Sequence, residues 1–256
     1  MVDMVKKSDK RQLETKQEKN LQKEKKIDAY RTTSIIVGAL FIIATVSTMV
    51  SIVFMGTSLE GSDYLDKIAD NENGIILSVI FWIILAISVA GIGFFMYPVL
   101  KKYHEGLAQG YVAFRLIETT LILVSAICLQ SLLTLGQEFV KADTIDTNLY
   151  DSSGIILKAI FNWSFIIGTM IFLGLGGLIL YYILYKLKLV PSWLSIWGLI
   201  GAALVLVYGL VSLFDYDPAI LSAPIAVQEM VFAVWIIVKG FDTTSIDSKS
   251  SKKDTN

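Results

Sequence analysis

The chain has 256 residues, of which 54% are apolar and 18% charged, and its mean hydropathy is +0.63. Soluble domains are about 45–50% apolar and about 25% charged, so this composition excludes an ordinary soluble globular protein. The formal net charge of −1 gives no sign of a nucleic-acid partner, and the single cysteine, Cys128, excludes a disulfide within the chain.

Six apolar runs are long enough to cross about 30 Å of hydrocarbon as helices. They cover residues 34–55, 75–97, 113–135, 159–185, 193–214 and 225–241. The apolar character of each run is continuous, whereas the strands of a membrane barrel alternate between apolar and polar residues. The sequence therefore predicts an all-α polytopic membrane protein, a bundle of six transmembrane helices.

The basic residues predict how this bundle is oriented. One side of the six spans carries nineteen Lys and Arg residues, and the other carries Lys67, Lys141 and Lys158. Positive residues are retained in the cytoplasm, so we expect a multi-pass protein of the plasma membrane with both termini cytoplasmic. Residues 1–31 are highly charged and poor in apolar side chains, and we expect them to form a disordered tail. Residues 242–256 are expected to form a second, polar cytoplasmic tail.

Polar side chains inside the spans are the best pointers to function, because a charge at the centre of a membrane helix costs about 2.5–3.5 kcal/mol. The candidates are Arg115, Glu118, Gln130, Asn162, Gln228 and Glu229. Arg115 and Glu118 are three residues apart, so they share one helix face and can pair. We expect two clusters: this pair in the cytoplasmic half, and Glu229 with the three amides in the outer half. The two glutamates should then lie too far apart to act together.

Two interpretations stay open for each cluster. The Arg115 and Glu118 pair either fixes helix packing or forms part of a substrate site, and the packing role is the simpler one. Glu229 needs a hydrogen-bond donor or a proton at its depth, and Asn162 or Gln130 could supply the donor.

Recognisable catalytic patterns are missing from the sequence. The single histidine, His104, is flanked by Lys101, Lys102 and Glu105, so we expect a solvated loop residue rather than a zinc ligand. Residues 56–60 begin like a nucleophile elbow but end in glutamate where that motif requires glycine. The sequence thus indicates no catalytic residue, no metal and no cofactor.

Three segments together resemble a known family. They are Tyr97-Pro98-Val99-Leu100-Lys101-Lys102 continuing to Glu118, Pro191-Ser192-Trp193-Leu194-Ser195-Ile196-Trp197 continuing to Ala202, and Gln228-Glu229-Met230 continuing to Phe241. In this order they resemble the domain of unknown function 4386 family, over about residues 31–242. The resemblance implies a six-helix integral membrane protein from a bacterium or a similar prokaryote. It implies no reaction, ligand or catalytic residue.

Our leading hypothesis is a non-enzymatic membrane protein whose polar intramembrane residues line a cavity that binds or translocates a small molecule, an ion or a lipid. One alternative is a structural or regulatory membrane component without a ligand. Another is an intramembrane enzyme acting on lipids, with Glu118 as its acid or base. From the sequence we expect the lipid bilayer as a partner. The sequence leaves the oligomeric state open.

Overall fold

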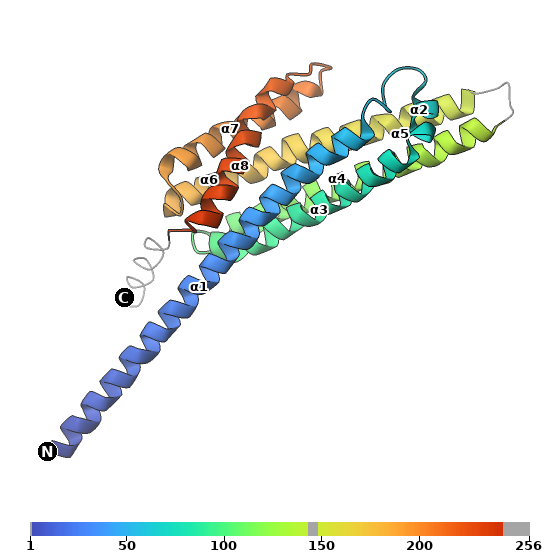
Figure 1. Cartoon of the computed structure of the whole chain (residues 1–256). Coiled ribbons are helices and arrows are strands. Elements are labelled where there is room, and N and C mark those ends of the chain that lie inside the picture. Colours follow the sequence, from blue (N-terminus) through green and yellow to red (C-terminus); the bar gives the residue numbers. More distant parts are fainter. Residues whose placement is uncertain (1, 143–147, 243–256) are drawn as a thin grey trace.

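The computed structural model describes residues 2–142 and 148–242, and side chains in its first helix are described at Gln17, at Leu21 and from Asp28 onward. The elements are α1 (Val2–Met55), α2 (Tyr64–Asp70), α3 (Glu72–Leu100), α4 (Glu105–Lys141), α5 (Asn148–Ile166), the π-helix η1 (Ile167–Phe172), α6 (Leu173–Leu187), α7 (Ser192–Ser212), the 3-10 helix η2 (Ala219–Ser222) and α8 (Ala223–Val238). Figure 1 shows their arrangement.

Six helical segments in the described part of the chain are long and apolar enough to cross a membrane. Three of them coincide with α3, α4 and α7, and a fourth is the part of α1 from Asp28 onward. The fifth joins α5, η1 and α6 into one continuous segment, and the sixth joins η2 to α8. The predicted all-α bundle of six spans is therefore confirmed.

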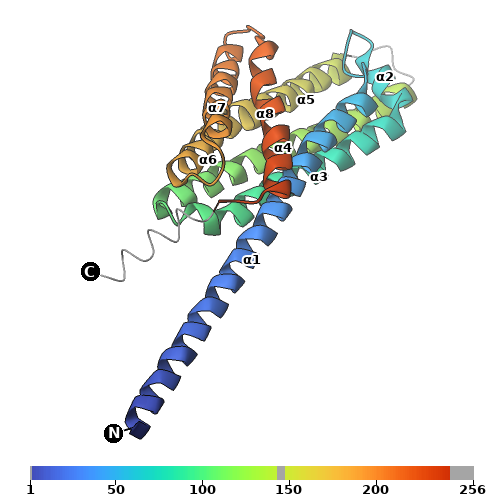
Figure 2. The same ribbon diagram turned by 60° about the vertical axis from the view of Figure 1, so that its left-hand side comes forward.

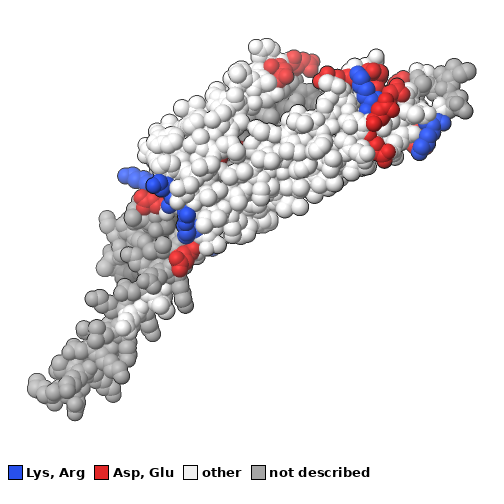
Figure 3. Space-filling model, viewed as in Figure 1, with Lys and Arg blue, Asp and Glu red and all other residues white. Residues whose placement is uncertain are grey.

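Charged side chains gather at the two ends of the bundle and leave an uncharged band between them on the face shown in Figure 3. We call the end near residues 28–31, 101–104, 186–191 and 239–242 the proximal end, and the end near residues 56–63 and 213–217 the distal end. Large apolar side chains such as Ile87, Ile127 and Val234 are exposed along the band. An exposed apolar belt of this kind is stable in lipid and unstable in water, which makes the chain a multi-pass membrane protein.

We expected residues 1–31 to be disordered. In the structure α1 begins at Val2 and runs without a break into the first span. The N-terminal part of α1 extends away from the bundle in both ribbon views (Figures 1 and 2). Lys, Glu and Gln are good helix formers, and the adjoining span supplies the helix nucleus, so only propagation is required. The expected polar tail after residue 242 lies outside the described residues.

Two apolar cores divide the bundle along its length. The proximal core includes Phe41, Met96, Tyr111, Leu184 and Phe232, and it joins α1, α3, α4, α6 and α8. The distal core includes Trp82, Ile122, Leu132 and Phe161, and it joins α1 to α5. On α4, the boundary between the cores falls between Tyr111 and Ile122, which is where Arg115 and Glu118 lie.

Small and hydroxylated side chains let these helices approach closely. Ser51 Oγ donates to Ser78 O at 3.2 Å, and Ser78 Oγ donates to Ser51 O at 2.8 Å, so a reciprocal pair of hydrogen bonds ties α1 to α3. A Cβ atom added at Gly136 would lie 2.6 Å from Leu65 O, which means that α2 packs directly on the backbone of α4. These contacts hold the distal half of α1, α2, α3 and α4 as one unit.

Candidate ligand-binding site within the membrane

Arg115 and Glu229 lie at similar depths in the membrane, on two helices that run in opposite directions. Arg115 is ten residues into α4, and Glu229 is nine residues before the end of α8. Both helix ends lie at the proximal end of the bundle, so at 1.5 Å per residue each side chain begins about 14–15 Å inside it. The two residues therefore lie close to the same level of the membrane.

Arg115 is the centre of a buried charge cluster. Its Nη1 donates to Glu118 Oε2 at 3.0 Å, and its Nε donates to Tyr111 Oη at 3.1 Å. Its Nη2 lies 4.0 Å from Glu229 Oε1. The guanidinium also lies over the rings of Phe41 and Tyr111, with its carbon 5.8 and 5.4 Å from their centroids. One cation on α4 thus meets carboxylates from its own helix and from α8.

The expectation of two separate clusters is wrong, because Glu118 and Glu229 both contact Arg115. The error came from the ends of the sixth span. Residues 225–241 placed Glu229 near the outer end of the helix, whereas the helical segment runs from Ala219 to Val238 and places it near the middle. A shift of several residues at a helix terminus displaces a side chain by about 1.5 Å per residue along the axis.

The three amides take different positions. Gln228 is fully buried, and its Nε2 donates to Leu194 O on α7 at 3.2 Å. Gln130 and Asn162 are exposed on the side of α4 and of α5. Neither forms a hydrogen bond with the Arg115 cluster among the described residues, and the charged neighbour of Glu229 is Arg115 at 4.0 Å rather than either amide.

A cavity of about 310 Å³ opens onto this cluster. Its walls come from α1, α3, α4, the α5–η1–α6 segment, α7 and α8, and they are mainly apolar. At one end of α8 the helix packs tightly on α1, where the Phe41 and Phe232 rings are 5.5 Å apart. Toward the distal end α1 and α8 separate (Figures 1 and 2). The cavity is lined there by Thr45, Thr48, Met49 and Ile52 of α1, by Ser222 at the end of η2, and by Ile225, Ala226 and Glu229 of α8.

Glu229 is the carboxylate of the cluster that a molecule in the cavity can reach. The side chains of Arg115 and Glu118 are 3% and 1% exposed, whereas that of Glu229 is 14% exposed. Glu118 is occupied by its hydrogen bond from Arg115, while Glu229 stands beyond hydrogen-bond distance of the guanidinium. The geometry thus separates an internal ion pair from an accessible acid.

The fourth span is distorted where it borders the cavity. Residues Ile167–Phe172 form a π-helix, and Thr169 and Met170 within it line the cavity. Single π-helical turns inside α-helices occur frequently at functional sites, because they displace one helix face. Apolar periodicity cannot reveal such a turn, and the sequence analysis therefore missed Thr169. It also missed Tyr111, although its position four residues before Arg115 on one helix was a usable signal.

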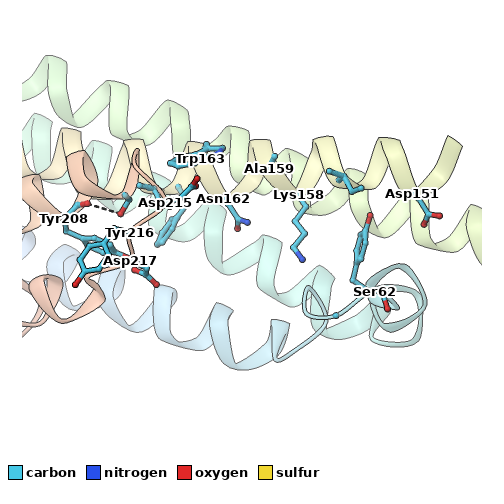
Figure 4. A pocket seen from close by; sticks show the side chains of 16 residues that line it. Ser62, Asp151, Lys158, Ala159, Asn162, Trp163, Tyr208, Asp215, Tyr216 and Asp217 are labelled. Carbon is cyan, nitrogen blue, oxygen red and sulfur yellow. Dashed lines mark hydrogen bonds between the residues drawn. The ribbon is translucent and has the colours of Figure 1, made fainter. Parts of the chain in front are cut away.

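A second hollow, of about 960 Å³, lies at the distal end between α5, the end of α7 and the loop before α2. We call it the distal vestibule. The charged residues that line it are Asp151, Lys158, Asp215 and Asp217 (Figure 4). Phe165 lines both the vestibule and the cavity, so its ring stands at the boundary between them.

Two groups beside the vestibule have perturbed ionisation. A hydrogen bond from Lys67, whose Nζ lies 2.7 Å from Asp63 Oδ1, lowers the pKa of the Asp63 carboxyl. Burial raises the pKa of the Tyr64 hydroxyl, and the nearby Asp151 charge adds to this effect. Both groups keep their ordinary charge near neutral pH. The charged side chains among the described residues that line the vestibule itself are three aspartates and one lysine.

His104 lies in the exposed turn between α3 and α4, as expected, and its Nδ1 accepts a hydrogen bond from Leu107 N at 3.2 Å. It is the N-cap of α4, where an acceptor satisfies one of the free backbone N–H groups. The described residues contain no group of three or more His, Cys, Asp and Glu side chains that could hold a metal ion.

Comparison with known proteins adds the family. No curated protein and no solved structure matches the chain significantly. The family described as "Domain of unknown function (DUF4386)" matches residues 36–240, which include five of the six spans in full, most of the first span and every residue of the charge cluster. The helical tail before residue 36 lies outside the match. The chain therefore belongs to the DUF4386 family.

Proposed function

We propose that this membrane protein binds a small amphiphilic molecule in the intramembrane cavity, with the polar group of the ligand at the Arg115 cluster. The observation that carries the proposal is the cavity itself, whose apolar walls end on the accessible carboxylate of Glu229. An apolar molecule with one polar end satisfies both parts of this surface. Ligand sites in proteins commonly combine apolar walls with a few polar groups in this way, and have volumes of about 300–1,000 Å³.

The ion pair between Arg115 and Glu118 also supports a structural role. Its hydrogen bonds join only residues of α4, which are Arg115, Glu118 and Tyr111. The side chains of Arg115 and Glu118 are almost fully buried. Removing one partner of such a pair leaves an uncompensated buried charge, so the pair is expected to stabilise the folded bundle. We therefore assign a structural role to the ion pair of Arg115 and Glu118, and a ligand-binding role to Glu229.

Orientation follows from the charge distribution. We infer that the proximal end faces the cytoplasm, because nineteen of the basic residues in the sequence belong to that side. The vestibule and the separation between α1 and α8 then face the outer side of the plasma membrane, and the ligand enters from there.

A photoreactive neutral alcohol tests the binding proposal. Purified protein in lipid nanodiscs is irradiated with 3-azioctanol, and the labelled peptides are identified by mass spectrometry. We expect label at the residues of α1, η2 and α8 that line the cavity, which are Thr45, Thr48, Met49, Ile52, Ser222, Ile225, Ala226 and Glu229. The variant Ala226→Phe fills the cavity and should lose this label.

The matched control is Val227→Phe, because Val227 is 54% exposed on the same helix turn and does not line the cavity among the described residues. It should keep the label of the unmodified protein. Uniform labelling of lipid-facing residues in all three proteins, with no enrichment at the cavity, would overturn the proposal.

A further inference from the structure

The charges in the cavity do not balance. Arg115 supplies one positive charge, and Glu118 and Glu229 supply two carboxylates. Glu118 takes the short contact at 3.0 Å, and Glu229 is left 4.0 Å from the guanidinium. A carboxylate in apolar surroundings requires a counter-ion, hydrogen-bond donors or a proton. No side chain among the described residues donates a hydrogen bond to Glu229, so a cation bound beside it would supply what the site lacks.

Three of the four hydroxyl groups in the cavity wall already donate to the backbone. Thr48 donates its hydroxyl proton to Ala44 O at 3.0 Å, and Thr169 donates its own to Phe165 O at 2.7 Å. Ser222 likewise donates to Ala219 O at 2.7 Å. Each hydroxyl has one proton, so these three side chains offer only oxygen lone pairs to a ligand. The polar part of the wall thus combines the Glu229 carboxylate and three hydroxyl oxygens that can only accept with the buried guanidinium of Arg115 and the hydroxyl of Thr45.

The distal vestibule has the same preference. Its aspartates outnumber its lysine by three to one among the described residues that line it, and Trp163, Tyr208 and Tyr216 lie with them in Figure 4. A hollow with charge of one sign raises the local concentration of ions of the opposite sign, and aromatic faces attract cations. The Asp217 carboxylate interacts with the Tyr208 side chain, and both residues line the hollow.

From these observations we infer that the ligand is a small organic cation: an ammonium group with an apolar body, whose nitrogen pairs with Glu229. This inference rests on the proposed function and adds the class of ligand. An ammonium group is all donor and no acceptor, which matches the Glu229 carboxylate and the hydroxyl oxygens of Thr48 and Thr169. Its apolar body lies along Phe165 and Met170, between Glu229 and the vestibule.

Three ligands of equal chain length separate the charge from the apolar contact. Octylammonium, octanol and octanoate are titrated by calorimetry into the protein in nanodiscs of zwitterionic lipid, and empty nanodiscs supply the background. We expect octylammonium to bind at least tenfold more tightly than octanol, and octanoate to bind most weakly. The variant Glu229→Gln should reduce the preference for octylammonium over octanol to less than threefold.

The matched control is Glu138→Gln, on an exposed carboxylate that pairs with Lys141 outside the cavity. It should keep the full preference. Retention of the elution volume and of the melting temperature shows that Glu229→Gln is folded. If that variant failed to fold, Glu229→Asp would serve instead, because it keeps the charge and should keep the preference while weakening all three ligands.

The outcomes distinguish this inference from the proposed function. Equal affinity for octanol and octylammonium, with both lost in Ala226→Phe, would overturn the cationic ligand and leave the cavity as a binding site. Tighter binding of octanoate would overturn it in favour of an anion at Arg115. Binding no stronger than to empty nanodiscs for all three ligands would overturn the inference and the proposed function together.

Discussion

Removing Arg115 should cost more stability than removing either of its carboxylate partners. In Arg115→Ala, Glu118 and Glu229 face each other without a cation, whereas in Glu118→Ala the guanidinium keeps Glu229 at 4.0 Å and Tyr111 at 3.1 Å. Breaking a buried ion pair and leaving a charge uncompensated costs about 3–5 kcal/mol. Loss of a single hydrogen-bond partner from a buried group costs about 1–3 kcal/mol. We expect Arg115→Ala in the first range and Glu118→Ala in the second.

The double variant should lose less than the sum of the two single losses, with a coupling free energy of about 1–2 kcal/mol. The free energy of unfolding is measured by reversible denaturation in mixed micelles, followed by tryptophan fluorescence. The Lys141 and Glu138 pair is an internal control, because it lies on the same helix with the same spacing and the same 3.0 Å contact, but is 69% and 57% exposed. Its variants should stay within about 0.5 kcal/mol of the unmodified protein.

Two results would refute this reasoning. One is strictly additive losses at Arg115 and Glu118, since contacting groups in a low-dielectric interior must couple. The other is a loss in Arg115→Ala no larger than in Lys141→Ala. A buried, hydrogen-bonded guanidinium would then behave as an exposed one, and the packing role of the ion pair would be lost.

Three further predictions concern the ends of the bundle. With Cys128 replaced by serine, Lys67→Cys should react with a membrane-impermeant maleimide in intact cells and Lys102→Cys only after permeabilisation; the reverse pattern would invert the proposed orientation. Tyr64→Phe should raise the unfolding free energy by up to about 1 kcal/mol, because the buried Tyr64 hydroxyl makes no hydrogen bond with the described residues, whereas a lower melting temperature would reveal a partner. Lys67→Ala should raise the pKa of Asp63 toward its ordinary 3.8, as followed by carboxyl NMR titration. Since the folded pKa of Asp63 is lowered, its contribution to stability is present above about pH 4 and disappears as the pH falls through the folded value, and an unchanged pKa in the variant would exclude Lys67 as the cause.

The sequence predicted the spans because hydrocarbon imposes a simple rule. A helix must present apolar side chains over about 20 residues to cross the membrane, and such runs can be recognised without knowledge of their neighbours. The Arg115 and Glu118 pair was predictable for a similar reason, since both residues lie on one helix three positions apart. The N-cap at His104 and its exposure also follow from local sequence.

Contacts between helices could not be read from those rules. Glu229 joins Arg115 because α8 begins earlier and ends earlier than its apolar run suggests, and because α8 packs against α1 and α7 so that Glu229 lies 4.0 Å from Arg115 on α4. Gln130 and Asn162 are exposed because of the way α4 and α5 are rotated about their own axes, which apolarity all round the helix leaves undetermined. The π-helical turn at Ile167–Phe172 depends on packing against α4 and α7.

The sequence by itself determined that this protein lies in a lipid membrane, how many spans it has and which charged residues lie within them. The tertiary structure decided which of those charges meet and where a cavity remains. The physical reason is that burial in lipid acts on each helix separately, whereas a charge cluster is made by side chains from two helices, α4 and α8, whose relative depth is set only when they pack.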